Sequence, residues 1–328
     1  MRDDRFGYDD FLSPFTWRYG SKEMRAIFSE RERRVTWRRV WAELARAEHQ
    51  YGLVSRRELR DILSKSRREY VDIERAHAIE RKIRHDLMAE IQVFARQAKR
   101  GGGKIHLGAT SMDIEDNADI LLFRRAADLV LSRLVNCLDA VAEKALSYRS
   151  LACMGWTHLQ PAEPTTLGYR LAGYAQDIAL DIDLLEFELA EHLKGKGMKG
   201  AVGTAASYQK LLGSANKAAK LEDRIMRNLG IDSFHVSSQT YPRKVDYLLL
   251  SCLGSVAQSC HKFGLDLRIL QSPSIGELSE PIGEKQVGSS AMPFKKNPTA
   301  AERMCSLARY VSSLPAVAFM NASSSILE

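Results

Sequence analysis

The residues best suited to chemistry lie in the segment 288–298, whose sequence is Gly-Ser-Ser-Ala-Met-Pro-Phe-Lys-Lys-Asn-Pro. This segment combines hydroxyl groups, lysines and a carboxamide, and its two prolines restrict the backbone. It closes a longer loop, 273–298, in which Gly276, Gly283 and Gly288 supply hinges. A loop with a nucleophile or base, a cation and an amide is typical of a lid that closes on an anionic substrate. An ordinary surface loop is the open alternative.

A histidine ahead of a predicted helix is the second candidate. His158 precedes Thr165 and Thr166, either of which would cap the helix that follows. The free imidazole has a pKa of about 6.5, so it can act as a general acid or base near neutral pH. A histidine that is simply hydrogen-bonded within a turn is the alternative.

Two other segments place polar side chains on or beside predicted helices. Thr110 and Ser111 precede a helix, where they would either cap it or help to bind an anion at its N-terminus. The triplet Arg84-His85-Asp86 falls inside a predicted helix, where it is either part of a site or a surface charge cluster.

The sequence lacks the spacings that hold metals and nucleotide cofactors. It contains no His-x-x-x-His or His-Glu-x-x-His motif, no Walker A motif, and no Gly-x-Gly-x-x-Gly after a strand. We therefore predict neither a metal site nor a bound cofactor. The basic, glycine-rich segment 194–200 has no strand before it, so it supports a phosphate loop only weakly, whereas 203–207 stays a candidate for lining a site.

Long helices must position these segments. No proline occurs between Pro14 and Pro161, and residues 109–154 contain neither glycine nor proline, as helix interiors require. Apolar residues recur at helical spacing through 131–145, 171–189 and 245–270. The predicted elements are a helical region over 1–108, long helices near 113–148, 164–194 and 243–272, a shorter helix at 299–321, and loops at 101–103, 155–162, 195–213 and 273–298.

These patterns favour an all-α fold, because the alternation that marks strands is scarce. Helices with such long apolar stripes need partners to bury them. We therefore expect a homo-oligomeric bundle.

Composition narrows the class of protein. The 328 residues are 45% hydrophobic and 27% charged, which is ordinary for a folded domain and excludes a disordered chain.

No apolar run is long enough to span a membrane, and the charged N-terminal residues 1–5 do not resemble a secretory signal, so we expect a cytoplasmic protein. Five scattered cysteines fit a reducing compartment. The net charge of +7 is spread among acids, which favours a small anionic metabolite over nucleic acid as the partner.

Taken together, three of these segments resemble the fumarase/aspartase superfamily. The string 288–298 is similar to its signature, and the Thr110-Ser111 and His158 segments resemble its other two shared regions in the same order. Within the superfamily the chain resembles the adenylosuccinate lyase family, in its animal-type branch. The strings that carry this second resemblance are Arg18-Tyr19, Arg84-His85-Asp86, 106–111, 239–244 and 289–309.

The resemblance implies a fold and an activity. The fold would be a fumarase/aspartase-like bundle of long helices that forms the core of a homotetramer. The activity would be β-elimination of fumarate from adenylosuccinate, which gives AMP, and from succinyl-aminoimidazole carboxamide ribotide, both in purine synthesis. The implied partners are anionic nucleotide substrates and further copies of the chain, with no cofactor, nucleic acid or membrane.

The resemblance also implies residue roles. Ser289 would be the base, although the adjacent Ser290 is hard to separate from it, and His158 would protonate the leaving nitrogen. Glu302 would orient His158 across a subunit boundary, and Lys295 would stabilise the carbanion. The other implied site residues are His85, which would grip phosphate or orient substrate, and the substrate-binding residues Arg18, Tyr19, Arg84, Asp86, Thr110, Ser111, Gln239, Asn297 and Arg303.

The resemblance covers essentially the whole chain and predicts more protein beyond it. The implied domains are an N-terminal substrate-binding domain at 1–111 and a central bundle at 112–328 that is incomplete at its C-terminal end, with the family's third, C-terminal helical domain absent. A truncated, non-catalytic subunit is one alternative. Another lyase of the superfamily, such as argininosuccinate lyase, is a second, and the Arg18-Tyr19 and 239–241 strings argue against it.

Overall fold

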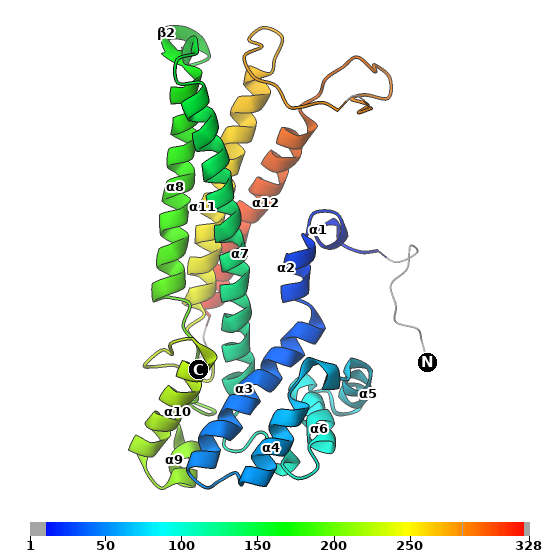
Figure 1. Cartoon of the computed structure of the whole chain (residues 1–328), viewed down its shortest axis with the longest axis vertical. Helices are drawn as coiled ribbons and strands as arrows, with labels where there is room; N and C mark the ends of the chain where they lie inside the picture. The colour runs from blue at the N-terminus through cyan, green and yellow to red at the C-terminus, as the bar shows by residue number, and fades with distance from the viewer. Residues whose placement is uncertain (1–10, 284, 325–328) are drawn as a thin grey trace. The chain divides into compact units, whose positions relative to one another are not determined.

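The computed structural model describes residues 11–283 and 285–324, which are mostly helical (Figure 1). The long helices are α3 (Glu30–Gln50), α7 (Ser111–Ser147), α8 (Leu167–Glu191), α11 (Lys244–Leu270) and α12 (Thr299–Ala322). The shorter ones are α1 (Pro14–Trp17), α2 (Lys22–Ile27), α4 (Arg56–Lys65), α5 (Ile73–Ile83), α6 (Asp86–Gln97), α9 (Ala206–Leu212) and α10 (Ala215–Leu229), with 3₁₀ turns η1 (Arg68–Tyr70) and η2 (Gly102–Lys104). Strands β1 (Ala152–Thr157) and β2 (Gln160–Thr166) form one antiparallel hairpin. The all-α prediction is confirmed apart from this hairpin.

The chain divides into two compact units. Among the described residues, unit 1 contains 11–129 and 193–242, and unit 2 contains 130–192, 243–283 and 285–324. The units therefore do not follow the predicted boundary at residue 111, because the first part of α7 and the segment 193–242 belong with the N-terminal helices. No described helix is both long and apolar enough to cross a bilayer.

Unit 1 is built around α3, whose buried face contacts α6. The Trp41 ring lies 6.1 Å from that of Phe94. Buried Glu90 of α6 accepts hydrogen bonds from Arg34 at 3.1 Å and from Arg38 at 2.7 Å, and both arginines are themselves buried. A buried carboxylate with two guanidinium partners keeps its charge compensated, and the triad ties the two helices together.

Unit 2 is a bundle of long helices. Figure 1 shows α8, α11 and α12 running alongside one another, with the second part of α7 beside them. Leu171 and Tyr174 of α8 pack against Val141 and Ala145 of α7 and against Phe263 of α11. These residues belong to the apolar stripes that the sequence predicts, so the periodicity identified the buried faces.

Small residues let α11 and α12 approach closely. A methyl group placed on Gly264 would lie 3.0 Å from Cys305 Sγ and 3.3 Å from the Ala301 carbonyl oxygen. Cys305 and Ala301 are both buried on α12. This contact sets the first turns of α12, where Glu302 and Arg303 lie, against α11.

Two predicted loops contain regular structure instead. The loop expected at 195–213 includes α9, which forms because Tyr208 and Leu212 find buried positions. The loop expected at 155–162 lies within the hairpin, whose β2 strand has prolines at 161 and 164. Prolines are tolerated there because a two-stranded hairpin has free edges on which no ladder hydrogen bond is lost.

A buried carboxyl in α3 predicts an unusual pH dependence of stability. Glu48 is fully buried, and neither of its carboxylate oxygens has a hydrogen-bond partner within the described part of the chain. Burial raises the pKa of Glu48 from an ordinary 4.5 to about 9, and the charge of Lys104 offsets this only partly. The unfolded chain releases this proton near pH 4.5, so the stability contribution is complete below that pH and is lost as the pH rises towards 9.

We therefore expect Glu48→Gln to flatten this slope and to raise the free energy of unfolding at pH 8 by roughly 2–4 kcal/mol. Urea denaturation at pH 5 and pH 8 measures the effect, and Glu69→Gln on the surface is the control. Equal pH slopes in wild type and Glu48→Gln would contradict the prediction.

Candidate active site

The loop 288–298 is closed at its base by a contact between its two ends. The Asn297 carboxamide donates from Nδ2 to the Gly288 carbonyl oxygen at 2.9 Å. A methyl group on Gly288 would lie only 1.9 Å from the Lys295 carbonyl oxygen, so no larger residue fits there. The carboxamide predicted to bind substrate therefore also holds the shape of the loop.

Within this loop Ser289 has the surroundings of an activated hydroxyl. Its Oγ accepts the backbone N–H groups of Ala291 at 3.3 Å and of Met292 at 3.2 Å. Ser289 is half-buried, whereas Ser290 is exposed. Two donors directed at Oγ stabilise an alkoxide more than a hydroxyl. This geometry favours Ser289 as the base, and exposed Lys295 supplies a positive charge on the same loop.

The segment after the loop is fixed by a buried carboxylate. Glu280 accepts the backbone N–H groups of Ala300 at 3.1 Å and of Ala301 at 2.5 Å, and so caps the start of α12. This cap orients the first turn, from which Glu302 and Arg303 project. The Glu302 carboxylate lies 4.0 Å from the Arg268 guanidinium of α11.

His158 lies in a hairpin turn, not directly before a helix as predicted. The last strand pair is Thr157 with Gln160, so His158 and Leu159 form a two-residue turn. Both have positive φ, +54° and +59°, as a type I′ turn requires. Side chains other than glycine at such φ cost about 1 kcal/mol or more each, and strain of this kind gathers at functional sites.

One part of the prediction for this segment is confirmed, because Thr166 caps α8 by accepting the Tyr169 N–H at 3.2 Å.

A cavity of about 450 Å³ lies beside the turn. His158, Trp156, Arg170, Tyr174 and Asp266 are among its lining residues. The Tyr174 hydroxyl donates to Asp266 Oδ2 at 2.8 Å. Burial, together with this carboxylate, raises the pKa of Tyr174 far above its usual value, so the tyrosine stays a neutral donor. The cavity walls therefore offer both cationic and neutral donors.

In unit 1, Arg84 and His85 separate two helices and Asp86 is the first residue of the second, so the triplet does not lie inside one helix as predicted. Arg84 ends α5 in the left-handed conformation, with φ +59°, which breaks the helix. His85 is the N-cap of α6, and its Nδ1 accepts the Met88 N–H at 3.5 Å. The same Nδ1 lies 3.6 Å from Asp86 Oδ1. With Nδ1 as the acceptor from Met88, a neutral imidazole carries its proton on Nε2, from which it can donate to a ligand.

The start of α7 organises the loops of unit 1. Asp113, fully buried in the first turn, accepts the backbone N–H groups of Thr110 at 3.1 Å and Gly200 at 3.1 Å and pairs with the buried Lys196 ammonium. Ser111 is the first residue of the helix. The positions of Thr110 and Ser111 thus depend on a residue that sequence reasoning did not single out.

The next turn of α7 contacts the segment that contains Gln239. The Asp116 carboxylate accepts the N–H of buried Tyr241 at 2.8 Å. A methyl group on Gly203 would lie 1.9 Å from the Ser237 carbonyl oxygen, which shows how closely two loops meet here. Gln239 is therefore carried by a loop that is fixed at both sides.

Glu115 is a further titratable group that the sequence did not single out. Burial, together with the charges of Asp86, Asp119 and Asp116, raises its pKa from 4.5 to about 7 against the opposing effect of Arg33. A carboxyl that titrates near neutral pH beside a predicted substrate-binding residue is a candidate proton donor. The run of acids at 113, 115, 116 and 119 was the available signal.

Arg18 and Tyr19 lie at the end of α1. The Arg18 guanidinium lies 5.8 Å from the Trp17 ring centroid, and the Tyr19 ring lies 6.5 Å from that of Phe15. Tyr19 is exposed. Both side chains are thus available for contacts with a ligand.

The predicted residues divide between the units. Unit 2 holds the residues predicted for proton transfer and carbanion stabilisation, namely His158, Ser289, Lys295, Asn297 and Glu302, and also Arg303, which is predicted to bind substrate. Unit 1 holds the others: Arg18, Tyr19, Arg84, His85, Asp86, Thr110, Ser111 and Gln239. Across the described ranges, no group of three or more His, Cys, Asp or Glu side chains is placed to hold a metal ion.

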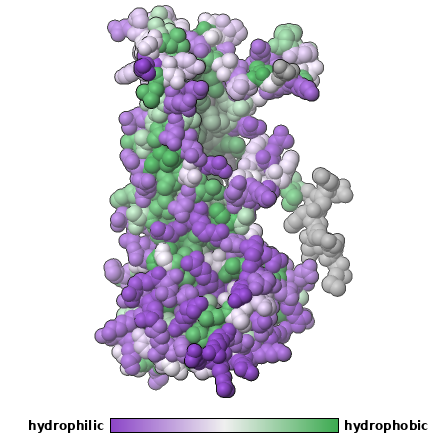
Figure 2. Space-filling view, in the orientation of Figure 1, coloured by the Kyte–Doolittle hydropathy of each residue, from purple (hydrophilic) through white to green (hydrophobic). Residues whose placement is uncertain are grey.

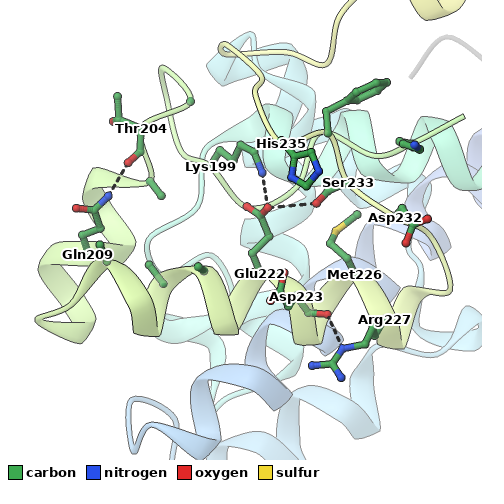
Figure 3. A pocket seen from close by; sticks show the side chains of 17 residues that line it. Lys199, Thr204, Gln209, Glu222, Asp223, Met226, Arg227, Asp232, Ser233 and His235 are labelled. Carbon is green, nitrogen blue, oxygen red and sulfur yellow. Dashed lines mark hydrogen bonds and ion pairs between the residues drawn. The ribbon is translucent and has the colours of Figure 1, made fainter. Parts of the chain in front are cut away.

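A larger pocket of about 990 Å³ lies in unit 1 and contains none of these residues (Figure 3). In Figure 3 Lys199 and Ser233 both point towards Glu222, with which they form an ion pair and a 3.2 Å hydrogen bond. The segment 203–207, which the sequence left as a candidate lining, contributes Gly203, Thr204 and Ala205 to the wall.

Comparisons with known proteins show which family the chain is similar to. A family model described as "Lyase" matches residues 18–312. The chain is 41% identical to an adenylosuccinate lyase of Saccharomyces cerevisiae, over 96% of this chain and 66% of that protein. It is 39% identical to one of Schistosoma mansoni, over 93% and 63%, and 38% identical to one of Pyrococcus horikoshii, over 93% and 67%. The chain thus spans about two thirds of the length of these curated relatives.

Solved structures show the same fold. A 3-carboxy-cis,cis-muconate lactonizing enzyme from Pseudomonas putida superposes with a TM-score of 0.81 at 28% identity, over 93% of this chain and 67% of that one. A fumarate lyase from Mesorhizobium superposes with a TM-score of 0.77 at 24% identity, over 89% and 64%.

Proposed function

The chain belongs to this lyase family, and we propose that it acts as an adenylosuccinate lyase. The reaction is a β-elimination that releases fumarate from adenylosuccinate, leaving AMP, and from succinyl-aminoimidazole carboxamide ribotide. The observation that carries the proposal is that curated relatives at 34–41% identity, over nearly all of this chain, are adenylosuccinate lyases.

The chemistry assigns a role to each part of the loop 288–298. A base must remove a proton from the carbon next to the one that bears the leaving nitrogen, and the negative charge moves onto a neighbouring carboxylate as an aci-carboxylate. Ser289 is the proposed base, since its Oγ already accepts two N–H groups. Lys295 and the Asn297 carboxamide are the proposed partners of the extra charge, because preorganised donors stabilise such an anion.

The leaving nitrogen needs a proton, and His158 is the proposed donor. Its position in a strained two-residue turn that lines a cavity supports this role, because strain of this kind gathers at functional sites. We propose that Glu302 orients His158 from another copy of the chain.

The substrate carries a phosphate and two carboxylates, and basic and polar groups of unit 1 suit it. We propose that Arg18, Tyr19, Arg84, Asp86 and Gln239 bind the nucleotide and its dicarboxylate tail together with Thr110, Ser111 and Arg303. His85 supports this proposal, because an imidazole whose Nδ1 accepts the Met88 N–H donates from Nε2 to an anionic oxygen.

We also propose that the chain assembles as a homotetramer whose sites draw on more than one copy. On α8, Leu180, Leu184 and Phe187 are 58%, 39% and 54% exposed and recur at helical spacing. Figure 2 shows hydrophobic residues, in green, exposed among the hydrophilic ones, in purple, on the face that the figure displays. An exposed apolar stripe on a long helix is what a bundle between copies would bury. The five cysteines, all free in the structure, fit the cytosol as the compartment.

A fumarate-release assay tests the proposed activity. We expect adenylosuccinate, and not argininosuccinate, to yield fumarate that is detected by its ultraviolet absorbance. The assay is run on the 328-residue chain and on the same chain extended by the C-terminal segment of the Pyrococcus horikoshii relative.

Turnover by the extended form alone would identify the 328-residue chain as a non-catalytic part of the enzyme. Failure of both forms on adenylosuccinate, or equal turnover of argininosuccinate, would contradict the proposal.

A further inference from the structure

One carboxylate joins the His158 hairpin to the segment that leads into the loop 288–298. Glu277 lies after α11, at the start of that segment. Its Oε1 accepts the indole N–H of Trp156 in β1 at 3.2 Å, and its Oε2 pairs with the Arg170 guanidinium in α8. Burial acts to raise the pKa of Glu277, but the hydrogen bonds from Arg170 and Trp156 hold it below its usual range, so the carboxylate stays ionised at neutral pH.

Arg170 also binds the hairpin directly. Its second nitrogen, Nη2, donates to the Met154 carbonyl oxygen at 2.5 Å. The strand pairing is irregular between Met154 and Trp156, as at a β-bulge. A methyl group on the intervening Gly155 would lie 2.6 Å from the Glu163 carbonyl oxygen, so this irregularity requires glycine. Bulges re-aim side chains and are frequent next to active sites.

The hairpin needs this anchor. A two-stranded hairpin is at best marginally stable in water, and most of β2 is exposed. The turn adds the strain of positive φ at His158 and Leu159. Trp156 is two residues from His158, so the contacts of Glu277 act close to the imidazole.

We propose that Glu277 is a positioning residue that fixes the His158 hairpin, through Trp156 and Arg170, relative to the segment that leads to Ser289. This inference rests on the proposed function, in which His158 is the general acid. Glu277 acts on the position of the imidazole and not on the substrate, so its loss lowers the rate of the chemical step more than it weakens substrate binding. A displacement of about 1 Å in a reacting group can cost about a hundredfold in rate.

The kinetic test compares Glu277→Gln, Arg170→Gln and the double variant in the form of the protein that cleaves adenylosuccinate. We expect each single variant to lower kcat by roughly 10–100-fold with KM changed only a few-fold, and the double variant to be little worse than either, because both act through one network. Glu163→Gln removes a charge from an exposed position of the same hairpin and is expected to keep wild-type kcat. Unchanged kcat in Glu277→Gln, or additive losses in the double variant, would overturn the proposal.

Amide hydrogen exchange tests the same proposal without activity, in the 328-residue chain. In Glu277→Gln we expect exchange over 152–166 to rise by roughly tenfold or more while 244–270 stays protected, and Glu163→Gln to match wild type. Unchanged exchange over 152–166, or a rise throughout unit 2, would overturn the anchoring role. An inactive wild type with local exchange in Glu277→Gln would instead reject the proposed function and leave the anchor supported.

Discussion

Replacing His158 by Gln or Ser289 by Ala is expected to lower kcat for adenylosuccinate by roughly 10²–10⁴-fold, the usual contribution of a positioned acid or base. Substrate binding should survive, because the proposed anion-binding residues lie on other segments, most of them in unit 1. The matched control is Ser290→Ala, since Ser290 is exposed while Ser289 Oγ accepts two backbone N–H groups. A loss in Ser290→Ala as large as in Ser289→Ala would contradict the assignment of the base.

Mixing the two inactive variants tests whether each site combines different copies of the chain. If one copy donates His158 and another Ser289, reassorted tetramers regain some sites with both wild-type groups, and activity returns. The experiment uses the form that turns over substrate, with subunit exchange verified by mass spectrometry of labelled chains. Exchange without any recovered activity would reject the shared site.

The long helices were predictable because their signals are local. Residues 109–154 contain no glycine or proline, and α7 runs through most of them, from Ser111 to Ser147. Stripes such as Leu171, Tyr174 and Leu185 of α8 are buried as the periodicity predicted. The site segments were recognisable for a similar reason, since each is a short contiguous string.

The hairpin was not predictable from the same signals. Its turn is His158-Leu159 and not the Asn-Gly that usually marks a type I′ turn, and β2 contains two prolines that argue against a strand. What decides its conformation lies far away in sequence, since Glu277 follows Trp156 by 121 residues. Contacts between residues so far apart produce no periodic pattern in the sequence, so sequence analysis could not predict them.

The role of the basic segment 194–200 was likewise not predictable from the sequence, because it depends on distant ion pairs. Its lysines and glycines suggested, weakly, a phosphate loop, but Lys196 is fully buried and pairs with Asp113, while Lys199 pairs with Glu222. A lysine that meets a carboxylate 83 positions earlier in the chain cannot be told from a solvent-exposed one by composition. Lys196 and Lys199 therefore stabilise the fold of unit 1 through their ion pairs.

Asp113→Asn is therefore expected to be among the most destabilising substitutions in the chain. Asp113 accepts N–H groups from Thr110, Lys199 and Gly200 and the Tyr208 hydroxyl, in addition to pairing with Lys196. An amide of the same shape would turn an NH₂ group towards some of these donors and would leave the Lys196 charge buried and uncompensated. Removing one partner of a buried ion pair costs about 3–5 kcal/mol, so we expect a loss of that size in the free energy of unfolding.

Urea denaturation at pH 7 measures this loss, and a second substitution separates its causes. Lys196→Met removes the positive charge that Asp113→Asn leaves buried without a partner. The double variant should therefore lose less free energy of unfolding than the sum of the losses in the two single variants. Lys262→Met breaks an exposed pair with Asp177 and should cost no more than about 1 kcal/mol. A loss below about 1 kcal/mol in Asp113→Asn would show that the first turn of α7 does not depend on this carboxylate. The positions of Thr110 and Ser111 would then have to be fixed by other contacts.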